Sequence, residues 1–165
     1  MRFRQKASII LSTAMVLMHL EQAIAVEIEP QGKALAAVLG STKVSAKSVG
    51  DTKFFYTKGA NGKPERVAVI EKGIYQPSCT HTWAIGLDGK TGAVTEVRVV
   101  EMSCPHAFPA KAASYLEQYK GKGPADVARL DSQVQTIAKA TGTCRLTTDA
   151  VTRAINNYAK AKGQL

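Results

Sequence analysis

The stretch THTWAIGLDGKTGAVTEVRVVE, residues 80–101, predicts a β-hairpin, the clearest structural element in the chain. Its first half, residues 80–87, carries the single tryptophan, Trp83, and its second half, residues 94–101, carries four valines. The residues between the halves, 88–92, are Asp-Gly-Lys-Thr-Gly, a composition typical of a tight turn. The sequence therefore predicts two antiparallel strands joined at this turn.

Apolar periodicity predicts the other elements. Residues 54–57 and 66–71 are short apolar runs on either side of the turn-rich residues 59–64, which indicates a second hairpin. Residues 41–51 favour a loop or weak strand. Helices are predicted over 28–39, over 110–120, over part of 126–140, and from Thr147 onward. This order of helix, strands and helices predicts an α+β fold, with a small antiparallel sheet of two hairpins packed with about four helices.

The residues before the last predicted helix form a candidate anion site. Residues 141–148 are small and rich in hydroxyl groups, and Thr147 and Thr148 favour a helix N-terminus. A turn at Gly142 that leads into a helix would direct free backbone N–H groups and the positive end of the helix dipole at one point. The pattern fits a phosphate site, and it also fits a capped helix that binds no ligand.

Two Cys-x-His pairs flank the hairpin of residues 80–101. Cys79 and His81 stand at its beginning, and Cys104 and His106 follow its end, so folding the hairpin brings all four side chains to one end of the sheet. Three interpretations are open: a Cys79–Cys104 disulfide, a Cys/His metal site, and a redox-active thiol pair. The third cysteine, Cys144, is then a free thiol, a ligand or an intermolecular link.

The N-terminus predicts export. A basic start and an apolar run over residues 7–20 precede the small-x-small sequence at residues 23–25. This pattern predicts a secretory signal peptide of residues 1–25, with an uncleaved membrane anchor as the alternative. Residues 26–165 would form a single domain in the periplasm or another exported compartment. Such compartments are oxidising, which favours a disulfide.

The charge of the chain limits its partners. The sequence has 22 basic and 13 acidic residues, a formal net charge of +9. The basic residues are scattered and have few aromatic residues among them, which indicates weak attraction to acidic partners or peripheral contact with lipid headgroups, and argues against nucleic-acid recognition. No Ser-His-Asp arrangement is evident, so hydrolase chemistry has little support.

Residues 74–159 resemble the FMN-binding domain found in the C subunit of the sodium-pumping NADH:quinone reductase and in the G subunit of the Rnf complex. A Gly-Leu-Asp-Gly-Lys turn at residues 86–90, a valine strand, a short loop, a helix and a Thr/Gly-rich ending come in that family's order. The ending resembles Thr-Gly-Ala-Thr-x-Thr-Ser followed by a helix. The resemblance implies an extracytoplasmic electron-transfer domain that holds FMN, often through the last threonine of Thr-Gly-Ala-Thr.

Two alignments of this motif are possible, and they place Cys144 or Arg145 where the family has its acceptor threonine. Neither residue offers a hydroxyl, so we expect non-covalent FMN, with Arg145 pairing to the phosphate. The hairpin and Trp83 would form a wall for the flavin ring. The predicted cofactor-binding residues are Thr141, Gly142, Thr143, Cys144, Arg145, Thr147, Thr148 and Trp83.

The loop at residues 103–106 is Ser-Cys-Pro-His, where the family usually has a sequence like Glu-Thr-Pro-Gly. This difference favours an alternative function: a Cys/His metal-binding or thiol-redox module on the same fold, with Cys79, His81, Cys104 and His106 as the candidate metal ligands. A small exported binding domain with one structural disulfide is a third hypothesis. We expect an electron-transfer or binding domain rather than a stand-alone enzyme, with a redox protein or a membrane redox complex as its partner.

Overall fold

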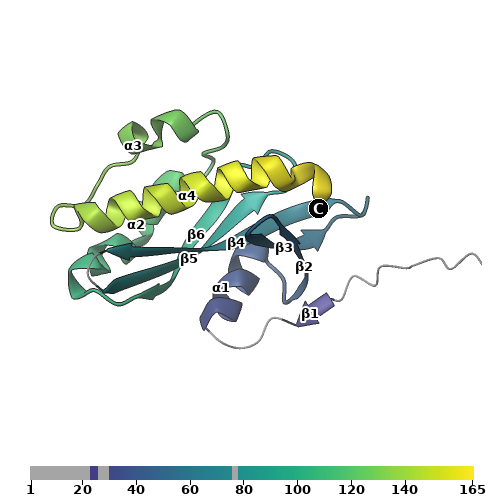
Figure 1. The fold of residues 1–165 in the computed structure, drawn as a ribbon, viewed down its shortest axis with the longest axis horizontal. Coiled ribbons are helices and arrows are strands. Elements are labelled where there is room, and N and C mark those ends of the chain that lie inside the picture. The colour runs from purple at the N-terminus through teal and green to yellow at the C-terminus, as the bar shows by residue number, and fades with distance from the viewer. Residues whose placement is uncertain (1–22, 26–29, 76–77) are drawn as a thin grey trace, which may run out of the picture.

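The computed structural model describes residues 23–25, 30–75 and 78–165, which form an antiparallel sheet with helices on both faces (Figure 1). Six strands lie in the sheet in the order in which they occur in the sequence, and each pairs with the next. The predicted α+β class is confirmed. The strands are β1 (Ala23–Ala25), β2 (Lys43–Val49), β3 (Thr52–Lys58), β4 (Pro64–Tyr75), β5 (Cys79–Asp88) and β6 (Val94–Met102).

The sheet extends beyond the two predicted hairpins. The residues predicted as a loop or weak strand include β2, which pairs with β3, and β1 in turn pairs with β2. Residues 1–22 of the predicted signal peptide lie outside the described residues. Among the helices that the structure describes, none has the length and apolar character needed to cross a bilayer.

The hairpin predicted over residues 80–101 is present as β5, β6 and their turn. The Asp88 carboxylate accepts hydrogen bonds from the backbone N–H groups of Lys90, at 3.0 Å, and Thr91, at 2.7 Å. Gly89 is required sterically, because a β-carbon there would stand 2.1 Å from the carbonyl oxygen of Pro64. The turn is therefore fixed both by its own side chains and by the neighbouring β4.

The helical elements differ from the prediction in the second half of the chain. The predicted helix over 110–120 is wrong as a single element, because Ala112 has extended backbone with ψ of 133° and separates two helical segments. Only residues 127–133 of the stretch 126–140 are helical. The elements are α1 (Pro30–Leu39), α2 (Ala113–Leu116), α3 (Leu130–Gln133), α4 (Thr141–Ala161), and the 3₁₀ segments η1 (Pro105–Lys111), η2 (Glu117–Tyr119), η3 (Val127–Arg129) and η4 (Lys162–Gln164).

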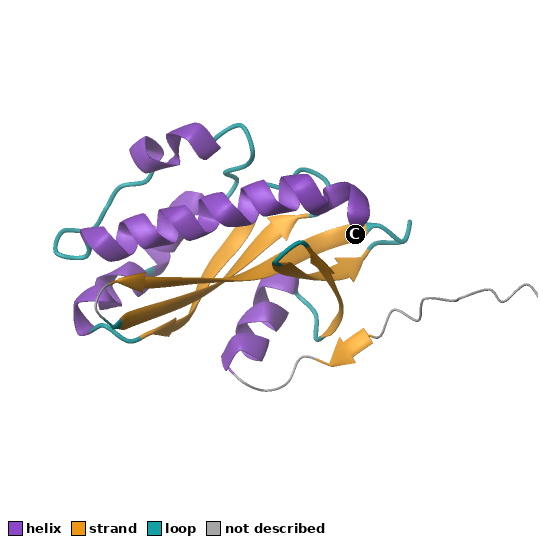
Figure 2. Ribbon diagram, viewed as in Figure 1, coloured by secondary structure: helices purple, strands orange, loops and turns teal. Residues whose placement is uncertain are grey.

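The sheet lies between α4 on one face and α1 on the other (Figure 2). Each face of the sheet carries its own hydrophobic core. Alternate residues of β5 illustrate the division: Trp83 and Ile85 belong to the core under α4, and Ala84 belongs to the core under α1. Each of these three side chains is fully buried. The α4 side holds most of the large buried residues, so α4 is the element whose placement determines the candidate site.

The prediction that the last helix begins near Thr147 is wrong, because α4 begins six residues earlier, at Thr141. Threonine is an unfavourable helix residue partly because its hydroxyl competes for backbone groups. Here the Thr147 hydroxyl donates to the Thr143 carbonyl at 2.9 Å and the Thr148 hydroxyl donates to the Cys144 carbonyl at 3.1 Å. The hydroxyls are satisfied within the helix, and burial of this face against the sheet stabilises the extra turns.

Candidate functional site

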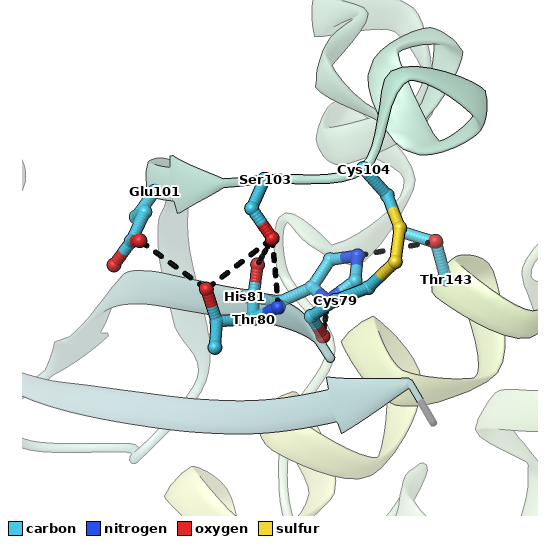
Figure 3. Close-up of a disulfide and its surroundings, with 7 residues drawn as sticks. All are labelled: Cys79, Thr80, His81, Glu101, Ser103, Cys104 and Thr143. Atoms are coloured by element: carbon cyan, nitrogen blue, oxygen red, sulfur yellow. Dashed lines mark hydrogen bonds between the residues drawn. A yellow bond between two sulfur atoms is a disulfide. The ribbon is translucent and has the colours of Figure 1, made fainter. Parts of the chain in front are cut away.

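The disulfide end of the sheet, defined by Cys79 and Cys104, is where the predicted site residues gather (Figure 3). The two sulfurs are bonded, and the Cα atoms are 5.3 Å apart. Cys79 is the first residue of β5, and Cys104 directly precedes η1. Both residues are half-buried, whereas the remaining cysteine, Cys144, is free and fully buried. The predicted disulfide is therefore present.

His81 links this disulfide to α4. Its Nδ1 lies 3.1 Å from the Cys79 carbonyl oxygen and its Nε2 lies 3.2 Å from the Thr143 hydroxyl. Burial lowers the pKa of His81, against the opposing effect of its hydrogen bond to Cys79, so the ring is neutral at pH 7. A carbonyl only accepts, so Nδ1 carries the proton and Nε2 accepts from Thr143. His81 thus holds β5 against the first turn of α4.

Trp83 lies beneath His81 and is part of the core. The two rings are stacked with centroids 5.6 Å apart, and the Trp83 side chain is completely buried. Gly73 lies over the same indole, since a β-carbon there would be 3.3 Å from its ring. In this arrangement Trp83 cannot form the wall of a ligand site, which was the role predicted for it.

The start of α4 is a helix N-terminus without a side-chain cap, exposed at Thr141. Ala140 occupies the N-cap position, and the first intrahelical bond runs from the Cys144 N–H to the Ala140 carbonyl at 3.0 Å. The N–H groups of residues 141–143 precede this bond and have no partner within the helix. In the part of the chain that the structure describes, Lys139 is the single non-glycine residue with positive φ, at 66°. This conformation turns the chain sharply into α4.

The predicted phosphate contacts fall into two groups. Thr141 and Arg145 are exposed and Gly142 is half-buried, so they can meet a ligand. The other four face the protein interior, where the hydroxyls of Thr143, Thr147 and Thr148 already have partners. They could not reach a phosphate without rearrangement of α4. The buried group is Thr143, Cys144, Thr147 and Thr148.

An exposed aromatic residue, Tyr75, which the sequence analysis missed, lies beside the start of α4. Tyr75 is the last residue of β4 and is 52% exposed, whereas the neighbouring Ile74, 56% exposed, leaves the sheet on the opposite face. The Tyr75 ring packs on Gly142, where a β-carbon would stand 2.4 Å from a ring carbon. The aromatic Tyr75 was the available signal, but nothing local indicated that it lies against α4.

The metal interpretation finds little support in the site. The sulfurs of Cys79 and Cys104 are bonded to each other and so are not free thiolate ligands. His106 lies exposed in η1. Across residues 23–25, 30–75 and 78–165, no group of three or more His, Cys, Asp or Glu side chains is placed to hold a metal ion.

Comparisons with known proteins do not suggest a function for the chain. No protein-family model matches the chain, and neither the curated proteins nor the solved structures include a significant match. A function has to be inferred from the residues of the chain itself.

Proposed function

We propose that the chain is an exported electron-transfer domain that binds FMN non-covalently at the start of α4. The proposal is carried by one juxtaposition: an uncapped helix N-terminus at residues 141–143 lies directly against the exposed ring of Tyr75. The free N–H groups and the helix dipole favour a phosphate. The exposed ring of Tyr75 offers a flat apolar surface. FMN joins a phosphate to a flat ring system and matches both features.

The true start of α4 also supports a new alignment with the family motif. Residues 138–144 are AKATGTC, and they align with Thr-Gly-Ala-Thr-x-Thr-Ser without an insertion. Lys139 stands at the motif glycine and has the positive φ that glycine adopts readily. Ala140, Thr141 and Thr143 are identical to the motif, and Thr141 takes the position of the threonine that carries the flavin in the family. The earlier alignments followed from placing the helix start at Thr147.

The charges around this helix start suit a phosphate. Arg145 is exposed one turn into α4, and Lys139 is exposed directly before it. Neither carboxylate nor carboxamide side chains occur in the first turn of α4. A guanidinium pairs with phosphate through charge-assisted hydrogen bonds. Arg145 would therefore add to the hydrogen bonds that the backbone N–H groups donate to the phosphate. The flavin supplies the redox chemistry when bound, and the chain supplies its position and polarity.

FMN titration of the purified protein tests the proposal. We expect quenching of FMN fluorescence on binding, weaker binding by Arg145→Glu, and little change in Arg98→Glu, a control at an exposed arginine paired with Glu96 on β6. Riboflavin, which lacks the phosphate, should bind more weakly than FMN and respond less to Arg145→Glu. Failure of the wild-type protein to bind FMN would overturn the proposal.

Acid precipitation separates the two modes of attachment. Flavin released into the supernatant is non-covalent, as we propose. Flavin that stays with the denatured protein, and is lost in Thr141→Val, would instead indicate an ester at Thr141.

A further inference from the structure

We infer that the Cys79–Cys104 disulfide is a second redox centre, which takes up two electrons from reduced flavin held at the start of α4. This inference rests on the proposed function and extends it from flavin binding to thiol–disulfide chemistry. The half-buried disulfide would then do more than link the start of β5 covalently to the residue before η1.

The pairing of β4 with β5 places the disulfide next to the proposed ring surface. Tyr75 and Cys79 are direct partners across these antiparallel strands, so their side chains leave the sheet on the same face. That face is the α4 side, because Tyr75 packs on Gly142 and His81, two residues beyond Cys79, reaches Thr143. Figure 3 shows the disulfide beside Thr143 in the first turn of α4. A flavin ring stacked on Tyr75 would therefore lie beside the sulfur of Cys79.

The surroundings of the disulfide allow it to react. Both cysteines are half-buried, in contrast to the fully buried Cys144. A thiolate formed at this end of the sheet would face the positive end of the α4 dipole, an arrangement typical of reactive cysteines.

The reaction is balanced without a further reactant. The S–S bond breaks as it takes up two electrons, and the sulfurs of Cys79 and Cys104 take up two protons. Reduced FMN supplies both electrons and both protons and becomes oxidised FMN. The products are two thiols, which could pass the electrons to a disulfide of a partner protein by thiol–disulfide exchange.

Anaerobic mixing with chemically reduced FMN tests the inference. The disulfide form of the protein is mixed with reduced FMN, quenched with N-ethylmaleimide, and analysed by peptide mass spectrometry. We expect the label on Cys79 and Cys104, with Cys144 unlabelled in the native protein, and a matching return of oxidised-flavin absorbance. If FMN binds but both cysteines remain bridged, the inference is overturned and the proposed function stands. If FMN does not bind, both are overturned.

A matched pair of aromatic variants tests the role of Tyr75. Tyr75→Ala should slow the labelling of Cys79 and Cys104 by about tenfold, the change expected for the loss of roughly 1.4 kcal/mol of stacking. Phe108→Ala removes another exposed ring, on η1, and should react like the wild type. Equal rates in all three proteins would contradict a ring position against Tyr75.

Discussion

Tyr75 and Gly142, which are distant in the sequence, are in such close contact that a β-carbon on Gly142 would stand 2.4 Å from the Tyr75 ring. Tyr75 ends β4, and Gly142 is the second residue of α4. The contact brings an exposed aromatic surface to an uncapped helix start. Glycine at position 142 permits this approach, although its backbone conformation is one that other residues also adopt.

Substitution of Gly142 by alanine should weaken FMN binding while changing the stability of the fold little. The new methyl group displaces the half-exposed Tyr75 ring, while alanine is the better helix residue by about 1 kcal/mol. We expect the free energy of unfolding to stay within about 1 kcal/mol of wild type and FMN affinity to fall. Urea denaturation and FMN titration measure the two effects. Gly163→Ala, which meets open space, is the control. Unchanged FMN affinity in Gly142→Ala would contradict a ring site on Tyr75.

Removal of the disulfide should destabilise the fold without preventing FMN binding. The bridge spans a sequence separation of 25 residues, for which the loop-entropy relation gives about 3.5 kcal/mol. The double variant Cys79→Ala, Cys104→Ala should lose roughly this amount in urea denaturation. Reduction of the wild-type protein should produce a similar loss. A loss well below 1 kcal/mol would show that the bridge constrains the unfolded chain little.

The Glu71–Arg153 pair should make stability depend on pH. Burial raises the pKa of Glu71 above its usual value, although its hydrogen bond to Arg153, at 2.8 Å, opposes the rise. The folded state then holds the proton more tightly than the unfolded state, so stability from this group is lost as pH rises through its folded pKa. Between about pH 4 and pH 7, Glu71→Gln should therefore gain stability relative to wild type. If the difference in the free energy of unfolding between Glu71→Gln and wild type stays constant across this range, the raised pKa of Glu71 is refuted.

Loss of Arg153 should change stability in the opposite direction: relative to wild type, the variant should become less stable as the pH rises. Arg153→Met leaves the carboxylate of Glu71, which is 11% exposed, without its partner. We expect destabilisation by about 2 kcal/mol at pH 7 and less near pH 4, where the carboxyl group is protonated. Arg98→Met is the control, because its partner Glu96 is 40% exposed and the pair should contribute under 1 kcal/mol.

A buried chain of hydroxyls should anchor the 3₁₀ segment η2 to α4. The Tyr119 hydroxyl lies 2.8 Å from those of both Tyr115 and Thr148. Tyr119→Phe should cost about 1–2 kcal/mol in urea denaturation at pH 7. Burial raises the pKa of Tyr119, so its contribution is complete below the unfolded pKa and is lost at more alkaline pH, where the variant and wild type should converge. Tyr75→Phe, at a tyrosine that is 52% exposed, should leave stability unchanged.

The amino-acid sequence alone predicted the elements whose causes are local. The turn at residues 88–92 is set by Asp88 and glycine, and the flanking valines have an intrinsic preference for strands. The convergence of Cys79 and Cys104 followed from folding this hairpin, and the structure confirms their bond. The order of elements along the chain likewise predicted the α+β class.

Only the tertiary structure decided where α4 begins and what lies beside it. Local preferences of threonine and glycine disfavour a helix over residues 141–146, but burial of Cys144 and the hydrogen bond of Thr143 to His81 stabilise it. The same packing buries Trp83 and leaves Tyr75 exposed against Gly142. These outcomes depend on contacts between distant segments, and their energies exceed the small local preferences that a sequence pattern reports.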